Sequence, residues 1–303
     1  MLRQKVLTAF VLLTASLTSA AAADFSGASA LEFTRKAVAF GPRPPGSPAN
    51  QKLQAYIESQ LKLLHCQISY DAFKIHMLGD PSREPRGIRE IIDAPMRNII
   101  AKFPGSSGRA IVITGHFDTK PMPGQVFLGA NDGGSSTGFL LELARSVNTM
   151  IHADDIYLVF FDGEEAFGEW SDTNGTFGSR HLADRWAAEG FLPHIKALIN
   201  VDMIGDKDLG ILQESMSSPK LLRLVWQTAH DTGYGKYFLD SAQATEDDHL
   251  PFLKKNVNAL DLIDFDYGPN NAYWHTPQDT MDKLSAHSFD VVGNVLLAVI
   301  RKL

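Results

Sequence analysis

The chain has 303 residues, a formal charge of −7 and one cysteine, Cys66. The acidic balance argues against nucleic acid as a partner, and a single cysteine excludes an internal disulfide and leaves any metal site to carboxylates and imidazoles. A chain of this length can bury a large core, and one α/β domain of this size is ordinary.

The N-terminal residues have the pattern of a signal peptide. Arg3 and Lys5 precede an almost wholly apolar run at 6–17, and small residues at 19–23 come before Asp24. The apolar run is shorter than the roughly 20 residues that a membrane-spanning helix needs, which makes a membrane anchor the weaker interpretation. We therefore expect residues 1–23 to be removed and residues 24–303 to form one catalytic domain. This domain would be exported to the periplasm or secreted, without membrane attachment.

Helical spacing of apolar residues predicts the first elements of the mature chain, two helices at 29–40 and 49–64. Residues 41–48, between these helices, contain too many prolines to be regular. The polar segment 78–89 predicts a surface loop or the tip of a hairpin. Two short strands are expected next, at 98–103 and 110–114, separated by a turn.

From residue 137 onward, strands and helices alternate along the chain. Residues 156–161, Ile-Tyr-Leu-Val-Phe-Phe, have the composition of a strand that is buried on both faces. The other expected elements are helices at 137–147, 179–188, 219–230 and 289–300, and strands at 195–201 and 259–263. This alternation predicts a single α/β domain, with a twisted, mostly parallel mixed β-sheet flanked by helices on both faces.

Polar residues collect where the expected strands end. Gly163 breaks the strand at 156–161, and Glu164 and Glu165 follow it directly. Because the carboxyl ends of parallel strands meet at one edge of a sheet, the other residues at such ends should lie near these two acids. Each residue alone is more readily explained as a cap or a solvated side chain, but several at successive strand ends indicate a site. The others are His116, Asp118, Asp132, Asp202 and His275.

Carboxylates and imidazoles without thiolates favour zinc in an open catalytic site. Such a site has three protein ligands and keeps one position for substrate or water. The metal would polarise a carbonyl group while a nearby carboxylate moves a proton. Adjacent acids such as Glu164 and Glu165 can divide these tasks, one binding the metal and one moving the proton.

These residues resemble those of two enzyme groups that share one fold. Over nearly the whole mature chain, the pattern is similar to zinc aminopeptidases with two co-catalytic metals and to animal-type glutaminyl cyclases. The Glu246-Asp247-Asp248-His249 run favours the cyclases, because the aminopeptidases usually have a single acid before that histidine. The motifs that carry the resemblance are His116-Phe117-Asp118, Asp132, Gly163 to Phe167 with Trp170, Asp202, and Trp274-His275-Thr276.

The resemblance implies a role for each of these residues. Asp132, Glu165 and His275 would bind one zinc ion per chain. Glu164 would act as a proton shuttle, with Asp202 and Asp247 hydrogen-bonded around it. In an aminopeptidase, His116 and Asp202 would instead help to bind a second zinc ion, and Glu164 would activate a metal-bound water. The residues expected to line the substrate pocket are Trp170, Trp274, Asp261 and Lys120.

The chain departs from the cyclase pattern at two places. Asp261 stands where the cyclases have a histidine, which concerns one wall of the pocket. Gly115 and Thr137 stand where they have a cysteine pair, which concerns stability only. A structural alternative also exists for Asp247, which could cap a short helix beginning near Leu250.

The expected function is therefore conversion of N-terminal glutamine to pyroglutamate with release of ammonia. The expected partners are peptides or proteins with N-terminal glutamine, and the enzyme is expected to be a monomer. The alternative is an exported two-zinc aminopeptidase, and the number of zinc ions per chain would separate the two. A binding protein without activity is less expected, because such a relative should have lost metal ligands and here none is missing.

Overall fold

The computed structural model describes residues 25–78 and 91–303, and its centre is a six-stranded sheet in the order β1-β2-β4-β3-β5-β8. Strands β4, β3, β5 and β8 are parallel, and β1 and β2 extend the sheet as an antiparallel edge. The predicted fold class is confirmed. The strands are β1 (Gln67–Leu78), β2 (Ile91–Phe103), β3 (Ala110–His116), β4 (Asp155–Phe161), β5 (Ile195–Asp202) and β8 (Ala259–Ile263).

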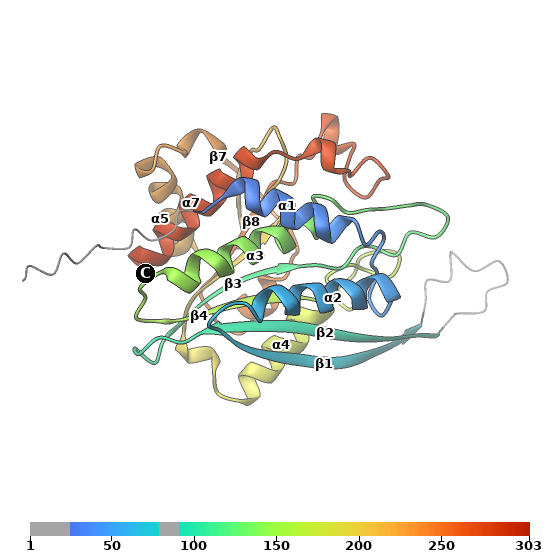
Figure 1. The fold of residues 1–303 in the computed structure, drawn as a ribbon, viewed down its shortest axis with the longest axis horizontal. Helices are drawn as coiled ribbons and strands as arrows, with labels where there is room; N and C mark the ends of the chain where they lie inside the picture. Colours follow the sequence, from blue (N-terminus) through green and yellow to red (C-terminus); the bar gives the residue numbers. More distant parts are fainter. Residues whose placement is uncertain (1–24, 79–90) are drawn as a thin grey trace, which may run out of the picture.

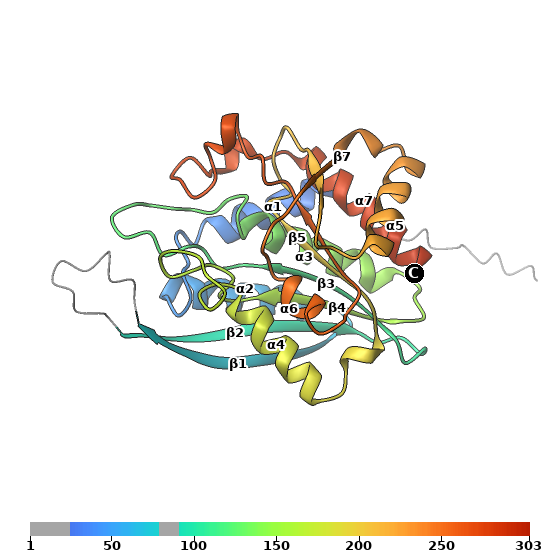
Figure 2. The ribbon, with the colours of Figure 1, turned by 180° about the vertical axis from the view of Figure 1, so that it is seen from behind.

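Helices cover both faces of this sheet. Figure 1 shows one face, which is covered by α1 (Gly27–Val38), α2 (Pro48–Leu61), α3 (Gly134–Thr149), α5 (Pro219–Asp231) and α7 (Ala286–Lys302). Figure 2 shows the opposite face, on which α4 (Phe177–Ala188) and the short α6 (Leu250–Leu253) lie. Because successive side chains of a strand point to opposite faces, each central strand contributes to two cores. Leu158 packs in the larger core under α3, and its neighbour Val159 packs under α4.

Local sequence explains where several helices begin. The hydroxyl groups of Ser26, Ser47 and Ser285 accept a hydrogen bond from the backbone N–H three residues later, at the starts of α1, α2 and α7. Such caps satisfy a donor that has no partner inside the helix. Pro48 and Pro219 occupy the first helical positions of α2 and α5, where the missing N–H has no cost.

Smaller elements complete the structure. A separate two-stranded parallel sheet consists of β6 (Ile211–Glu214) and β7 (Phe238–Gln243). The 3-10 helices are η2 (Leu192–His194), η3 (Gly235–Tyr237), η4 (Pro269–Asn271) and η5 (Met281–Lys283). In the described ranges, no helix combines the length and apolar character needed to cross a membrane.

The predicted helices and strands are confirmed within a few residues, but the sequence missed β1, the first half of β2, β6 and β7. The pattern of β1 is weak because it is an edge strand with many exposed side chains. The predicted signal peptide at 1–23 lies outside the described residues. The same holds for the predicted loop beyond Leu78, which itself ends β1.

Candidate active site

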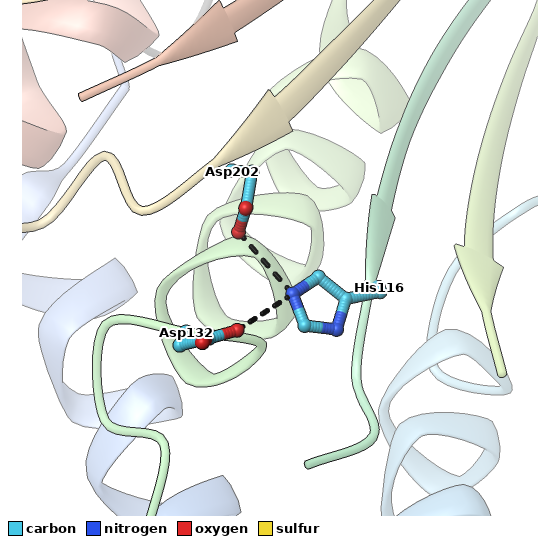
Figure 3. A group of neighbouring side chains, drawn as sticks. All are labelled: His116, Asp132 and Asp202. Atoms are coloured by element: carbon cyan, nitrogen blue, oxygen red, sulfur yellow. Dashed lines mark hydrogen bonds and ion pairs between the residues drawn. The ribbon is translucent and has the colours of Figure 1, made fainter. Parts of the chain in front are cut away.

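His116, the last residue of β3, is the centre of a first group of polar side chains (Figure 3). Its Nε2 atom lies 3.2 Å from Oδ1 of Asp132 and 3.2 Å from Oδ1 of Asp202. Asp202 ends the neighbouring strand β5, and Asp132 belongs to the loop before α3. Burial opposes a charge on His116, but the surrounding carboxylates, Asp202 foremost, raise its pKa well above the usual range.

A second group consists of Asp132, Glu165 and His275. Nε2 of His275 lies 3.3 Å from Oδ2 of Asp132 and 3.2 Å from Oε2 of Glu165. Asp132 therefore belongs to both groups and presents a different oxygen to each histidine. The imidazole of His275 stacks on the ring of Trp274, with centroids 4.0 Å apart. The backbone φ of His275 is 51°, and such a conformation costs on the order of 1–3 kcal/mol and is concentrated at functional sites.

Both groups have the chemistry of a metal site. Within residues 25–78 and 91–303, they are the two sets whose ligand atoms all lie within 4.8 Å of one another. Among the described residues, Asp132 Oδ2 and Glu165 Oε1 are buried and have no hydrogen-bond partner, which is rare for buried polar atoms. Two carboxylates and an imidazole are suitable ligands for zinc with an open coordination position. The residues of the second group therefore fit a divalent metal ion.

Asp118 fixes the two adjacent acids that follow β4. Its Oδ1 atom accepts a hydrogen bond from the backbone N–H of Glu164 at 3.1 Å, and its Oδ2 atom accepts one from Glu165 at 3.3 Å. Gly163 turns the chain just before them with a φ of 74°, and a Cβ atom there would lie 2.4 Å from Sδ of Met96. With the backbone held in this way, Glu165 reaches the second group and Glu164 lines the cavity described below.

A buried guanidinium group supports the loop that carries Asp132. Arg43 is fully buried, and its Nε donates to the carbonyl of Phe117 at 2.8 Å. Its other nitrogens donate to the carbonyls of Leu128 and Gly129. Burial lowers the pKa of Arg43 to about 10, against the opposing effect of nearby carboxylates. Sequence reasoning recognised only an irregular segment here, because a single arginine is usually exposed and carries no local signal of burial.

Asp279 holds the same loop from the other side. Its two oxygens accept the backbone N–H groups of Asn131 and Asp132 at 2.8 and 3.1 Å, and the hydroxyl of Tyr267 donates to it at 2.8 Å. Asp279 follows His275 by four residues, so it joins two segments that supply ligands to the second group. No role was predicted for Asp279, and its position close to His275 in the chain is the signal by which it could have been found.

Glu164 lies among other buried acids. Burial raises its pKa well above the usual range, and the charges of Glu165 and Asp247 raise it further, against the opposing effect of His116. Burial and the charge of Asp202 raise the pKa of Asp247 to about 6. The raised pKa means that Glu164 holds a proton more readily than a solvated carboxyl group does.

The expected hydrogen bonds from Asp202 and Asp247 to Glu164 are not formed among the described residues. Asp202 contacts His116 instead. Asp247 accepts a hydrogen bond from the side chain of Asn200 at 3.0 Å and another from the backbone N–H of Asp248. Of these two acids, Asp247 influences the pKa of Glu164 through its charge and not through a shared hydrogen bond.

A cavity of about 510 Å³ opens above both groups. Trp170, Trp274 and Lys120 line it, as the sequence analysis expected. The indole N–H of Trp170 donates to Oε2 of Glu246 at 2.8 Å, and Nζ of Lys120 lies 3.9 Å from Oε2 of Glu165. At its inner end the cavity is lined by Asp132, Glu164, Glu165, Asp202, Asp247 and His275.

Comparison with known proteins identifies the family. Residues 98–300, well over half of the chain, match the sequence model of Peptidase family M28. The chain belongs to this family. This match confirms the predicted α/β fold and the family resemblance that the sequence motifs indicated.

The relatives of this M28 protein include cyclases and an exopeptidase. A glutaminyl-peptide cyclotransferase from Drosophila melanogaster is 30% identical, over 84% of this chain and 75% of the relative. The structure of a glutaminyl cyclase from an Acidobacteriales bacterium is 39% identical and covers 95% of this chain and 98% of that chain, with a TM-score of 0.85. A Zn-dependent exopeptidase from Parabacteroides distasonis is 27% identical and covers 92% of this chain and 99% of that chain, with a TM-score of 0.76.

Asp261 does not line the cavity of this M28 protein, so the prediction for this residue is wrong. It is fully buried in β8, where its carboxylate accepts a hydrogen bond from Asn200 at 3.1 Å. Ile263 at the end of β8 lines the cavity instead. Because alternate residues of a strand are spaced by about 7 Å, Asp261 lies one step too far from the edge of the sheet.

The capping interpretation of Asp247 is also wrong. Helix α6 begins at Leu250, its N-cap residue is His249, and no side chain caps it. The carboxylate of Asp247 lines the cavity and bonds to Asn200, away from the start of the helix. The carboxylate of Asp247 can therefore influence other groups that line the cavity, such as Glu164.

Proposed function

We propose that this M28 protein is a glutaminyl-peptide cyclotransferase. It converts N-terminal glutamine of peptides and proteins to pyroglutamate and releases ammonia. Similarity to the glutaminyl cyclases, at up to 39% identity over 95% of the chain among the structures described above, supports this activity.

The proposal rests mainly on the position of Asp247, a buried acid that lines the same cavity as Glu164. In cyclisation the attacking group is the substrate's own amine, so the site has to hold that amine close to the proton shuttle and keep the proton poised. An extra acid whose charge raises the pKa of Glu164 suits this task. Hydrolysis by a metal-bound water needs no such third carboxylate.

We propose one zinc ion per chain, held by Asp132, Glu165 and His275. The two buried carboxylate oxygens without hydrogen-bond partners and the nearby imidazole support this choice. When bound, zinc supplies Lewis acidity toward the oxygen of the substrate's side-chain amide.

Glu164 then acts as the proton shuttle. It accepts a proton from the substrate's α-amine while the amine nitrogen forms a bond to the side-chain amide carbon. It next gives that proton to the amide nitrogen, whose bond to the same carbon breaks, and ammonia leaves. Trp170 and Trp274 would form walls of the pocket that receives the substrate, and Lys120 would stay near Glu165.

An aminopeptidase is the second candidate, and one observation favours it. His116 and Asp202 form a second possible metal group that shares Asp132 with the first. His116 and Asp202 would then help to hold a second zinc ion, and Asp132 would belong to both sites. In that case Glu164 would activate a water molecule and the products would be free amino acids.

One assay separates the two activities. Purified, zinc-loaded protein is incubated with a Gln-initiated peptide and, separately, with a leucine amide, and ammonia, pyroglutamyl peptide and free leucine are measured. The proposal predicts ammonia and pyroglutamyl peptide in equal amounts from the first and no leucine from the second. Free glutamine from the first substrate and free leucine from the second would establish a peptidase. The Glu164→Gln protein serves as the control for background cyclisation.

We also propose that residues 1–23 are a signal peptide and that residues 24–303 act as one domain and a monomer outside the cytoplasm. The basic start, apolar run and small residues of the N-terminal segment support this assignment. N-terminal sequencing of protein recovered from the cell exterior or periplasm would test it, with Asp24 as the expected first residue.

A further inference from the structure

The mouth of the cavity differs in character from its inner end. Glu169, Trp170 and Glu246 line the cavity and are exposed, whereas the acids of the inner end are buried. Glu169 and Trp170 belong to the segment that follows β4, and Glu246 belongs to the segment that follows β7. The mouth is therefore a surface on which an aromatic ring and two carboxylates lie together in contact with water.

The ring of Trp170 is held in place. Its indole N–H donates to Oε2 of Glu246 at 2.8 Å. Gly175 lies against the ring, because a Cβ atom there would come within 2.7 Å of the Trp170 side chain. The side chain remains 36% exposed. A fixed, partly exposed indole can bind a cation over its face.

In the described part of the chain, the two carboxylates of the mouth are not neutralised by a nearby cationic side chain. In the part of the chain that the structure describes, neither Glu169 nor Glu246 forms an ion pair, and the cavity's lysine, Lys120, lies beside Glu165. The inner acids differ, because a bound metal and shared protons would compensate their charges. The mouth thus presents uncompensated negative charge next to an aromatic ring, and both features attract a cationic side chain.

We propose that the cavity mouth selects substrates in which lysine or arginine directly follows the N-terminal glutamine. This inference rests on the proposed function, because it assumes that the glutamine's reacting groups occupy the inner end, next to Glu164. The following side chain must then lie at the mouth, beside Trp170 and between the segments that carry Glu169 and Glu246. The same charges disfavour glutamate or aspartate at that position.

The test compares dipeptide amides of equal length. Gln-Lys-amide, Gln-Lys(Nε-acetyl)-amide and Gln-Glu-amide are cyclised by the native protein, and kcat/KM is measured for each. Acetylation removes the charge and keeps the length of the lysine side chain. We expect kcat/KM for the lysine substrate to exceed that for the acetylated one by on the order of fivefold. We also expect the glutamate substrate to be the slowest. The lysine preference should shrink between 50 and 500 mM salt, because exposed charges are screened.

Two variants assign the effect to the mouth. Glu246→Gln keeps an acceptor for the Trp170 indole and removes only the charge, and Glu169→Gln removes the second charge. Each should reduce the preference for the charged substrate, and the double variant should bring the ratio close to one, with the larger loss of kcat/KM on the lysine substrate. Glu189→Gln is the matched control, because Glu189 is an exposed acid at the far end of α4, and it should leave the ratio unchanged.

The outcomes are distinct. Cyclisation of the three substrates at equal rates, or a preference that survives in the double variant, would overturn the selectivity and leave the proposed function standing. Absence of ammonia from the acetylated and the charged substrate alike would refute the proposed function and the selectivity with it.

Discussion

The two groups of possible metal ligands share Asp132 but differ in their access to the cavity. The side chain of His275 is 20% exposed and lines the cavity, whereas that of His116 is 1% exposed and does not. His116 is enclosed by carboxylates of Asp118, Asp132 and Asp202, at 3.2 to 3.5 Å. A metal ion in the second group (Asp132, Glu165 and His275), here called the open group, can contact a substrate in the cavity, whereas His116 has no such access. This difference in access supports our proposal that the open group holds the zinc ion that acts on the substrate.

Loss of the metal should have the largest effect. We expect exhaustive chelation to abolish cyclisation and zinc to restore it, because no thiolate holds the ion. Glu165→Gln should weaken zinc binding by more than the roughly 10- to 100-fold typical of residues that only support a ligand. Zinc content after dialysis and residual activity measure both effects. Full activity in metal-free protein would contradict the proposal that the open group binds a catalytic metal ion.

Glu164→Gln should retain zinc but lower turnover by a factor on the order of 10² or more, the usual scale for loss of a general acid and base. Glu165→Gln is its matched partner, since both changes replace adjacent acids by the same amide. Zinc content and kcat are measured on the two proteins in parallel. If both lost zinc to the same extent, the division of labour between the two acids would be wrong.

A smaller effect is expected for Asp247→Asn. This variant should keep zinc and lose little thermal stability, because the amide oxygen of asparagine can still accept one of the two hydrogen bonds that Asp247 receives, from the Asn200 side chain and from the backbone N–H of Asp248. Cyclisation of a Gln-initiated peptide should fall at least about tenfold, or roughly 1.4 kcal/mol in barrier. A melting curve and kcat/KM together check this prediction. Normal cyclisation would remove the structural argument that separates a cyclase from a peptidase.

The sequence predicted the central strands well because their burial on both faces requires continuous apolar runs, as at Ile156 to Phe161. It missed β1, where the chain lies at the edge of the sheet and Tyr70 is 39% exposed. It also missed β7, where four of the six side chains are exposed. A periodic pattern marks a strand only when one face is buried consistently.

The site could be predicted to the extent that its residues follow strand ends. His116, Glu164, Glu165 and Asp202 do so, and the parallel sheet brings them together. The support given by Arg43 could not be predicted, because its hydrogen-bond partners lie 74 to 89 residues further along the chain. The prediction for Asp261 was wrong because the residue lies inside β8, two residues before the strand ends. The sequence did not show how far Asp261 lies from the edge of the sheet, where the cavity opens.

The most direct test of the account is the number of zinc ions per chain in active protein. Metal-free protein is titrated with zinc while bound metal and cyclisation of a Gln-initiated peptide are followed together. We expect activity to reach its maximum at one zinc ion per chain, bound by the open group that contains His275. A maximum at two ions per chain would contradict this expectation, because His116 and Asp202 would then hold a second metal.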